Sequence, residues 1–560
     1  MKYSFLPLMA LLASGIVGLL ALSACDAGLS GERLDNEPPR TYLAVRDTSL
    51  VENICRQTPS GFVCTDDDNL FTSTVFVAWT GVDPDGFVVG YELRYYDSSE
   101  RPGVDDLWTH TTSRDTLILL PLPFGQSTAQ VVFEVRAIDN QGLKDPNPAR
   151  TVFPIGNSDP TIRLIAFETP PDTTWDIISF GFNASDPDGP QDLLAIEFSL
   201  NDEENFVSIP PNVQFITLVA ETVPPGTPTT SARVFFGRGF SSTSVTVDGL
   251  RLDADNTLFI RAMDRSGATS NLISYPNRDL DQRWFVRQPK NDVLLVNDFR
   301  AGRSDEVLPF HRAALRGYLG SASFDVWDLS QPMASNLYST ALPPVAVPTL
   351  RETFKRWRYI YWVSNNVTAS VIGNNLAFSA SFLEDFLATG GKIFVQVPFT
   401  APPAGEVDFN NPAYDLLPAE SIVVRPGTSV PPSLAIPNNG RVQAAQPVPG
   451  TGRMLPELRA QRLAFTLPYT INPSTTVPLY QGEFIDRDAN NAPWTGSSVV
   501  ATMDVERRVG LLALQLYTRN RYDFAGPGAD GQAPCLAVQY ILEGLSFPGT
   551  PGNCPAPSFR

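Results

Sequence analysis

The chain has 560 residues, of which 43% are hydrophobic and 18% charged, and its formal net charge is −19. This hydrophobic fraction is enough to build buried cores, so the composition excludes an intrinsically disordered protein. The sequence has no basic patch, which argues against a nucleic-acid-binding protein because phosphate binding needs clustered Lys and Arg. At about 150 residues per domain, the length predicts three or four domains.

An apolar run from Phe5 to Leu22 opens the chain and is followed by Ser23, Ala24 and Cys25. The run is about long enough for a membrane-spanning helix. The small residues and the polar sequence directly after them instead favour a signal peptide. Leu22-Ser23-Ala24-Cys25 resembles the lipobox of bacterial lipoproteins at all four positions, which implies cleavage before Cys25 and lipidation of its thiol and new amino group. An ordinary secretory signal or an uncleaved anchor, with Cys25 incidental, is the alternative.

Residues 1–24 are therefore predicted to be a lipoprotein signal peptide, and residues 25–38 a linker. The rest of the sequence has no second apolar stretch of about 18 residues, so everything after Cys25 is expected on one side of a membrane. We expect a bacterial cell-envelope protein that is anchored in a membrane through its lipid and faces the periplasm or the cell exterior.

The other four cysteines fall into two local pairs, Cys55 with Cys64 and Cys535 with Cys554. An exported chain permits disulfides, and local pairing is favoured among the three connectivities that four cysteines allow. A zinc site is the less favoured alternative, because the sequence has no Cys-x-x-Cys spacing. We predict two disulfides, Cys55–Cys64 and Cys535–Cys554.

The first half of the chain contains a repeat. Its segments are VFVAWTGVDPDGFVVGYELRYY (75–96) and VVFEVRAIDNQG (131–142) in the first copy, and IISFGFNASDPDGPQDLLAIEFSL (177–200) and TLFIRAMDRSG (257–267) in the second. Hydrophobic and polar residues alternate in these segments, and Gly, Pro and Asp bound them, a pattern typical of β-strands. Several such strands within about 100 residues indicate a β-sandwich.

The two copies are similar to fibronectin type III and related immunoglobulin-like modules. The strand around Trp79, the GYELRY strand and the late VFEVRAIDNQG strand carry the resemblance. It covers residues 39–155 and, more loosely, 156–288, and it implies two β-sandwiches of a kind that mostly binds, spaces or presents other domains. The second copy departs from the pattern by a Pro- and Thr-rich insertion around Val213–Ser231.

Both copies carry Asp-Pro-Asp-Gly in a loop between two predicted strands, and a further aspartate ends a late strand. In an immunoglobulin-like sandwich these two loops lie at the same end. Clustered carboxylates suit Ca²⁺, which takes about 6–8 oxygen ligands, and the arrangement is similar to the stiffened junctions of cadherin-like repeats. Asp-Pro-Asp-Gly is also a good turn sequence, so a plain turn is the alternative to calcium binding. The candidate calcium ligands are Asp83, Asp85, Asp139, Asp159, Asp186, Asp188 and Asp264.

The sequence pattern changes near Lys290. Continuous apolar runs, typical of strands buried on both faces, alternate with helical periodicity, which indicates an α/β domain with a mainly parallel sheet over 289–560. The predicted strands are 292–299, 322–329, 359–365 and 392–397, followed by a hairpin over 498–519. The predicted helices begin at Pro309, at the Ser381 capping box and at Cys535, and a Pro-rich insertion is expected at about 401–460.

This half is loosely similar to class I glutamine-amidotransferase-like, or flavodoxin-like, domains through VLLVND, the GGKIFVQV unit and the hairpin. The nucleophile of that family should follow a strand in a tight turn, yet KIFVQV leads into Pro398-Phe399-Thr400 without a Cys or Ser. The sequence has only two histidines, His110 and His311, so it cannot supply a catalytic triad on that pattern. His311 is interpreted as a surface or packing residue.

Ligands of open α/β sheets bind at the carboxyl ends of the strands. Asp298, Arg300, Asp305 and Asn365 are expected near those ends, where they could form a polar ligand-binding pocket. Loop solvation and helix capping are the alternative roles of these residues.

The expected fold is thus two all-β sandwich modules followed by an α/β domain. The missing nucleophile favours a protein that is not an enzyme and that binds or scaffolds, with a glycan or another envelope protein as its partner. The alternative is an envelope hydrolase that uses carboxylates at the strand ends of the α/β domain, since acidic-residue chemistry needs neither Cys nor His. No cofactor other than calcium is indicated.

Overall fold

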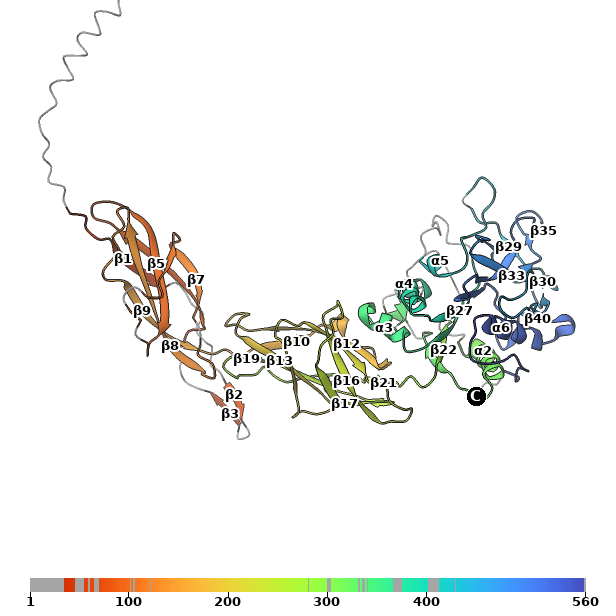
Figure 1. Cartoon of the computed structure of the whole chain (residues 1–560), viewed down its shortest axis with the longest axis horizontal. Helices are drawn as coiled ribbons and strands as arrows, with labels where there is room; N and C mark the ends of the chain where they lie inside the picture. Colours follow the sequence, from red (N-terminus) through yellow and green to blue (C-terminus); the bar gives the residue numbers. More distant parts are fainter. Residues whose placement is uncertain are drawn as a thin grey trace, which may run out of the picture. The chain divides into compact units, whose positions relative to one another are not determined.

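The computed structural model describes residues 35–45, 55–58, 61–64, 70–100, 102–103, 106–120, 122–280, 282–299, 304–330, 333–334, 338–339, 341–365, 375–400, 412–428 and 430–557. The predicted signal peptide and Cys25 lie outside these ranges. Within them, no helix is both long enough and apolar enough to cross a membrane. The chain divides into two compact units, Met1–Ser158 and Asp159–Arg560 (Figure 1).

The first unit contains a sandwich of two antiparallel sheets. One sheet has the order β1 (Arg40–Val45), β4 (Thr74–Val82), β7 (Asp115–Leu119), and the other has the order β6 (Thr109–Thr111), β5 (Val88–Asp97), β8 (Thr128–Asp139), β9 (Ala149–Gly156). Buried and partly exposed residues alternate along β4, because successive side chains of a strand point to opposite faces. Trp79, Tyr91 and Phe133 meet in the core between the sheets. This arrangement confirms the predicted sandwich of the first copy.

A separate hairpin in the first unit pairs β2 (Cys55–Thr58) with β3 (Gly61–Cys64). Its register sets Cys55 opposite Cys64. The side chains of these two cysteines lie outside the described part of the structure, so their disulfide stays a prediction.

The second unit begins with the second sandwich. One sheet has the order β10 (Thr161–Leu164), β12 (Ile177–Ser185), β15 (Phe215–Ala220), β16 (Thr229–Phe236), β17 (Thr246–Arg251), and the other has the order β14 (Val207–Ile209), β13 (Leu193–Leu200), β19 (Leu258–Asp264), β20 (Ile273–Tyr275). Phe180, Phe198 and Trp284 are fully buried between them. A small third sheet joins β11 (Thr173–Thr174), β21 (Phe285–Val286) and β18 (Ala254–Asp255).

The segment predicted as an insertion, Val213–Ser231, belongs to this sandwich. It forms β15, in which all six residues are buried, and the start of β16. The prolines that suggested an insertion lie in the connection between these strands. Among the described residues, this sheet has five strands, whereas the corresponding sheet of the first sandwich has three, so the segment contributes to a longer sheet. Strand β15 was not predicted because FITLVA is a short apolar run without the alternation that marks half-buried strands.

The C-terminal domain is built on a sheet of mixed direction. Its first five strands are parallel, in the order β23 (Asp325–Asp328), β22 (Val293–Asp298), β26 (Tyr359–Ser364), β27 (Lys392–Gln396), β37 (Val509–Leu512). The sheet continues through antiparallel pairs in the order β36 (Val499–Asp504), β33 (Thr476–Gly482), β30 (Arg441–Ala444), β31 (Leu458–Ala460), β40 (Phe524–Ala525). The β36–β37 pair confirms the predicted hairpin, whereas the sheet as a whole is mixed rather than mainly parallel.

The segment predicted as a Pro-rich insertion supplies part of this sheet. Strands β30 and β31 come from it, as do the short elements α5 (Ala413–Leu416), β28 (Ser421–Ile422) and β29 (Leu434–Ala435). The remaining short elements are η1 (Ala166–Glu168), β24 (Met333–Ala334), β25 (Tyr338–Ser339), η2 (Ala346–Leu350), α3 (Arg351–Phe354), β32 (Tyr469–Thr470), β34 (Ile485–Asp486), β35 (Ala492–Pro493), β38 (Tyr517–Thr518), β39 (Arg521–Tyr522) and η4 (Pro527–Ala529).

Three longer helices accompany the sheet: α2 (Ser304–Leu319), α4 (Asn375–Ala388) and α6 (Gln532–Gly544). Helix α2 begins before Pro309, which lies inside it at the expense of one backbone hydrogen bond. Helix α4 also begins earlier than predicted, so Ser381 lies within the helix and does not cap it. The disulfide between Cys535 and Cys554, whose Cα atoms are 6.3 Å apart, joins α6 to the C-terminal tail as predicted.

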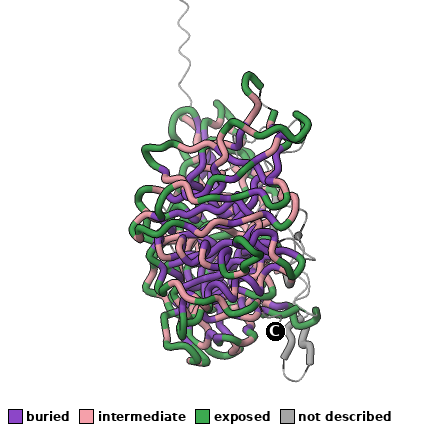
Figure 2. The backbone as a smooth tube through the Cα atoms, turned by 90° about the vertical axis from the view of Figure 1, so that its right-hand side faces the viewer, coloured by how far each residue is buried: buried purple, intermediate pink, exposed green. Residues whose placement is uncertain are grey.

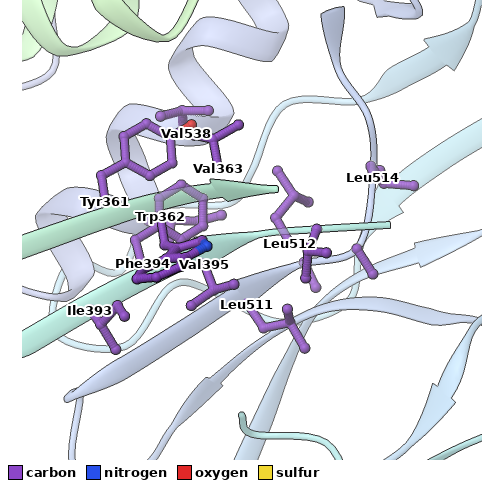
Figure 3. Packing of buried hydrophobic residues seen from close by; sticks show 14 of the residues in the cluster. Tyr361, Trp362, Val363, Ile393, Phe394, Val395, Leu511, Leu512, Leu514 and Val538 are labelled. Carbon is purple, nitrogen blue, oxygen red and sulfur yellow. The ribbon is translucent and has the colours of Figure 1, made fainter. Parts of the chain in front are cut away.

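The core of the C-terminal domain lies around the parallel strands. Side chains from three neighbouring strands, among them Tyr361, Phe394 and Leu512, lie together with Val538 of α6 (Figure 3). All six residues of β22 and of β26 are buried, as expected for strands covered on both faces. Figure 2 shows buried stretches inside the folded parts and exposed stretches in the outer loops.

Candidate functional site

The second sandwich brings three aspartates together at one of its ends. The loop between β12 and β13 supplies Asp186 and Asp192, and Asp264 is the last residue of β19. One carboxylate oxygen of each residue lies within 4.8 Å of the other two. Strands β13 and β19 pair with Leu193 opposite Asp264, which places Asp192 beside the end of β19. Because β12 and β19 belong to different sheets, the three aspartates connect the two sheets.

The Asp-Pro-Asp-Gly segment of this loop does form a turn. The backbone N–H of Asp188 donates to Asp186 Oδ1 at 2.8 Å, and the backbone N–H of Gly189 donates to the Asp186 carbonyl at 3.1 Å. Gly189 has φ +113°, a conformation that favours glycine. The turn leaves the second carboxylate oxygen of Asp186 unused, so the turn and a ligand role of Asp186 are compatible.

The electrostatics of these aspartates are unfavourable without a cation. Burial raises the pKa of Asp186 to about 7, and the charges of Asp188, Asp192 and Asp264 act in the same direction. Burial also raises the pKa of Asp192, with Asp264 and Asp188 adding to the effect and Arg265 opposing it. Asp186 Oδ2 and Asp192 Oδ2 are buried and accept no hydrogen bond from the described part of the chain. Hard divalent cations bind carboxylate oxygens of this kind.

Asp139, which ends the late strand of the first sandwich as Asp264 does in the second, has protein partners on both carboxylate oxygens. Asp139 Oδ2 accepts a hydrogen bond from Asn36 at 2.6 Å, and Oδ1 accepts from the backbone N–H groups of Gln141 and Leu143 at 2.8 and 2.9 Å. Burial acts to raise the pKa of Asp139, but these hydrogen bonds outweigh it and the pKa is lowered. This carboxylate is therefore satisfied by the protein itself.

The Asp-Pro-Asp-Gly loop of the first sandwich has two aspartates. Asp85 Oδ2 accepts a hydrogen bond from the backbone N–H of Glu37 at 3.2 Å. Burial raises the pKa of Asp83, and the charges of Asp85 and Asp139 add to the shift. Among the described residues, three carboxylates within ligating distance of one another occur only in the second sandwich.

Asp192 is the member of the group that the sequence patterns did not single out. Val88 lies opposite Asp139 in the first sandwich, and Leu193 lies opposite Asp264 in the second. The residue before each of these positions is Phe87 in the first sandwich and Asp192 in the second. The second loop has two more residues between Asp-Pro-Asp-Gly and the next strand than the first loop has. Aligning the two repeats with a gap at this point would have placed Asp192 directly before the strand. Asp159 is not part of the group, so its predicted role as a ligand stays a prediction.

The strand ends of the C-terminal sheet are occupied by hydrogen bonds within the protein. Asp298, the last residue of β22, accepts from Trp362 Nε1 at 3.1 Å and from Asn375 Nδ2 at 2.7 Å. Asn365 follows β26, and its buried Oδ1 has no partner in the described part of the chain. Arg300 and the side chain of Asp305 lie outside the described residues, so the predicted pocket of four residues stays a prediction.

His311 belongs to a buried chain of hydrogen bonds. Its Nδ1 lies 2.7 Å from the Tyr361 hydroxyl, which donates to Gln396 Oε1 at 2.8 Å, and Gln396 Nε2 donates to the Leu514 carbonyl at 3.0 Å. Burial lowers the pKa of His311 to about 3, so the imidazole is neutral and Nδ1–H donates to Tyr361. Of the two predicted roles, surface or packing, the structure supports packing, and it adds Tyr361 as a hydrogen-bond partner.

A cleft of about 600 Å³ lies between the second sandwich and the C-terminal domain. Trp175, Arg287 and Trp327 line it, together with the carboxylates of Asp172 and Asp328. The two indole rings pack edge to face with centroids 6.1 Å apart, and the Arg287 guanidinium lies 4.2 Å from the Trp175 ring centroid. The cleft thus combines one cation, two carboxylates and aromatic walls at a domain interface, which is a frequent location of ligand sites.

Comparisons with known proteins place no family on the whole chain. No protein-family model matches it, and no curated protein matches it. It is similar to the fibronectin(III)-like modules of Clostridium thermocellum CbhA, with 13% identity over 40% of this chain and 93% of that chain and a TM-score of 0.15. It is also similar to the FN1-FN3 domains of chicken CNTN1, with 10% identity over 40% of this chain and 66% of that chain and a TM-score of 0.16. TM-scores this low carry no argument, so the sandwich assignment is based on strand order and pairing.

Proposed function

We propose that this chain is a lipid-anchored protein of the bacterial cell envelope, facing the periplasm or the cell exterior, that binds a glycan. The sequence Leu22-Ser23-Ala24-Cys25 supports the anchor. In this proposal the two sandwiches carry a C-terminal α/β domain similar to the amidotransferase-like domains, and that domain acts in binding rather than catalysis. The observation that carries the binding role is the cleft between the second sandwich and the C-terminal domain.

The chemistry of the cleft favours an uncharged ligand with many hydroxyl groups. The carboxylates of Asp172 and Asp328 can accept hydrogen bonds from hydroxyl groups. The Arg287 guanidinium, whose Nη1 donates to the Val326 carbonyl, has further N–H groups that can donate to hydroxyl oxygens. The two carboxylates disfavour an anionic ligand, and Arg287 offsets part of their charge toward a cationic one. Trp175 and Trp327 are 3% and 6% exposed, so they define the shape of the cleft and offer no broad stacking surface. A neutral sugar fits these conditions.

The two walls of the cleft are held together by buried contacts, which keep the binding geometry fixed. Trp175 precedes β12 yet packs against Trp357 of the C-terminal domain, with ring centroids 4.7 Å apart. Arg356 Nε donates to Asp176 Oδ1 at 3.0 Å, and its Nη2 donates to the Ala220 carbonyl at 2.8 Å. A preformed cleft binds with a smaller loss of conformational freedom than one that closes around its ligand.

Calorimetric titration of the mature full-length chain with neutral oligosaccharides tests the proposal. N-acetylglucosamine tetramer and maltotetraose are suitable probes, because both lack charge. We expect binding of at least one of them, weakened about tenfold or more by Asp172→Ala, because one lost hydrogen bond to a charged group costs about 1.5–3 kcal/mol. Asp279→Ala is the matched control, since Asp279 is an exposed aspartate that does not line the cleft.

Two outcomes would contradict the proposal. Absence of binding to both oligosaccharides, or equal binding by the Asp172→Ala variant, would show that the cleft is not a glycan site. New reducing ends in the incubated oligosaccharide would instead favour the hydrolase alternative, with Asp172 and Asp328 as the first carboxylates to replace.

A further inference from the structure

We propose that the second sandwich binds one calcium ion through Asp186, Asp192 and Asp264. The site lies at the end of the sandwich formed by the β12–β13 loop and the end of β19. This inference goes beyond the proposed glycan binding and does not depend on it, because none of the three residues lines the cleft.

The first observation is the convergence of three carboxylates. Their nearest oxygens lie within 4.8 Å of one another, a spacing at which a single ion can contact all three, since Ca²⁺–oxygen distances are about 2.3–2.6 Å. Two of the residues come from one loop, and Asp264 comes from a strand of the other sheet. A bound ion would therefore link the two sheets of the sandwich at this end.

The second observation is a buried carboxylate oxygen of the group that has no hydrogen-bond partner among the described residues. The Asp186 side chain is only 9% exposed, and its Oδ2 accepts no hydrogen bond from the described part of the chain. Asp192 Oδ2 is also a buried atom that accepts no hydrogen bond from the described residues. A buried carboxylate oxygen without a partner is costly, and native proteins rarely leave one without an ion or a water molecule. A cation between these oxygens would supply the missing partner.

The donor set selects the ion. The three ligand residues provide only carboxylate oxygens, the donors that hard cations prefer, whereas zinc and copper favour sulfur and imidazole. Asp188, which is fully buried in the same loop, adds a further negative charge, and Arg265 is the cation that opposes it. Ca²⁺ tolerates an irregular set of oxygens completed by water, whereas Mg²⁺ demands near-octahedral geometry. An irregular loop and a strand end therefore suit Ca²⁺ better.

The first sandwich provides an internal control. Phe87, which is 63% exposed, stands where the second sandwich has Asp192. Among the described residues, the first sandwich therefore lacks one of the three clustered carboxylates. Asp83→Asn in the first loop should leave calcium binding unchanged.

The test uses the mature full-length chain after removal of bound metal by a chelator. Calorimetric titration with CaCl₂ should give one site, with a dissociation constant of the order of 10⁻⁴–10⁻³ M that is typical of extracellular modules. At a calcium concentration about 100 times this constant, the ratio of folded to unfolded second unit should rise about 100-fold, which raises its melting temperature. MgCl₂ should bind at least tenfold more weakly.

The variants distinguish a ligand role from a purely structural one. Asp186→Asn and Asp192→Asn should each weaken calcium binding tenfold or more, whereas Asp83→Asn should not. In chelator, Asp186→Asn should melt no lower than the wild type, because it removes a buried charge. The proposal is overturned if calcium changes neither heat nor melting temperature, if magnesium binds as tightly as calcium, or if the variants in the second loop bind calcium like the wild type.

Discussion

The contact between Asp176 and Arg356 leads to a pH-dependent stability prediction. Asp176 is 6% exposed, and Arg356 Nε donates to its Oδ1 at 3.0 Å. Burial raises the pKa of Asp176 from 3.8 to about 6, although Arg356 opposes the shift. Because the folded pKa is above the unfolded one, the free energy of unfolding falls as the pH rises from about 4 to 6 and stays low above that. At about 1.4 kcal/mol per pKa unit, the ionised Asp176 costs the folded state about 3 kcal/mol at pH 7.

We predict that Arg356→Met destabilises the second unit by about 2 kcal/mol at pH 7 and by about 1 kcal/mol at pH 5. Without Arg356, Asp176 would take up a proton, which costs about 4.4 kcal/mol at pH 7 for a group with pKa 3.8. In the wild type the ionised Asp176 already costs about 3 kcal/mol. The difference between the two costs, about 1.4 kcal/mol, is the loss of unfolding free energy that comes from the charge. The lost hydrogen bond to the Ala220 carbonyl adds about 1 kcal/mol. At pH 5 Asp176 is mostly protonated in the wild type, so the variant loses only the hydrogen bond to the Ala220 carbonyl.

Urea unfolding followed by tryptophan fluorescence at pH 5 and pH 7 measures both values. Arg283→Met is the matched control, because Arg283 pairs with Asp255 and both side chains are more than half exposed. Such a pair contributes less than about 1 kcal/mol, so this variant should show little effect at either pH. A loss for Arg356→Met that is the same at both pH values, or larger at pH 5, would refute the reasoning.

Three further predictions concern other parts of the chain. Trp108→Ala should destabilise the first unit by about 2 kcal/mol, because Arg94 and Arg136 lie 4.3 and 4.1 Å from its ring; an unchanged melting temperature of that unit would contradict this. Cys535→Ser opens a disulfide between residues 19 positions apart and should cost the second unit about 3 kcal/mol. A reducing agent should reproduce this loss in the second unit of the wild type and leave the second unit of the variant unchanged. Cys25→Ser should release the chain from membranes in a fractionation experiment, and continued sedimentation with lipid would rule out the lipid anchor.

Much of the fold could be predicted from the sequence where the signal is local. The alternation around Trp79 and the apolar run of β22 both predicted strands that the structure contains. The predictions failed where the bounds of an element depend on side-chain packing. Helix α4 continues six residues before the predicted capping box because Leu376, Ala377 and Ala380 find buried positions, and strand β15 forms inside a proline-rich segment because all of its residues are buried. Neither burial pattern is visible from local sequence.

The candidate site was only half predictable for the same reason. The Asp-Pro-Asp-Gly motif and the aspartate after a late strand pointed to Asp186 and Asp264, and the structure brings both together. Asp192 has no motif of its own, and it joins them because Leu193 pairs with Asp264 across neighbouring strands. The cleft near Trp175 was not predicted, since its lining combines residues that are distant in the sequence, such as Trp175, Arg287 and Trp327.

The sequence by itself determined the strand periodicity of the two sandwiches and the pairing of Cys535 with Cys554. These properties depend on residues that are close together in the sequence, so the sequence pattern alone reveals them. Only the tertiary structure decided which aspartates share a site, how the C-terminal sheet combines parallel and antiparallel strands, and that Trp175 of the second sandwich packs into the core of the next domain. Those properties depend on long-range burial, for which local patterns carry no information.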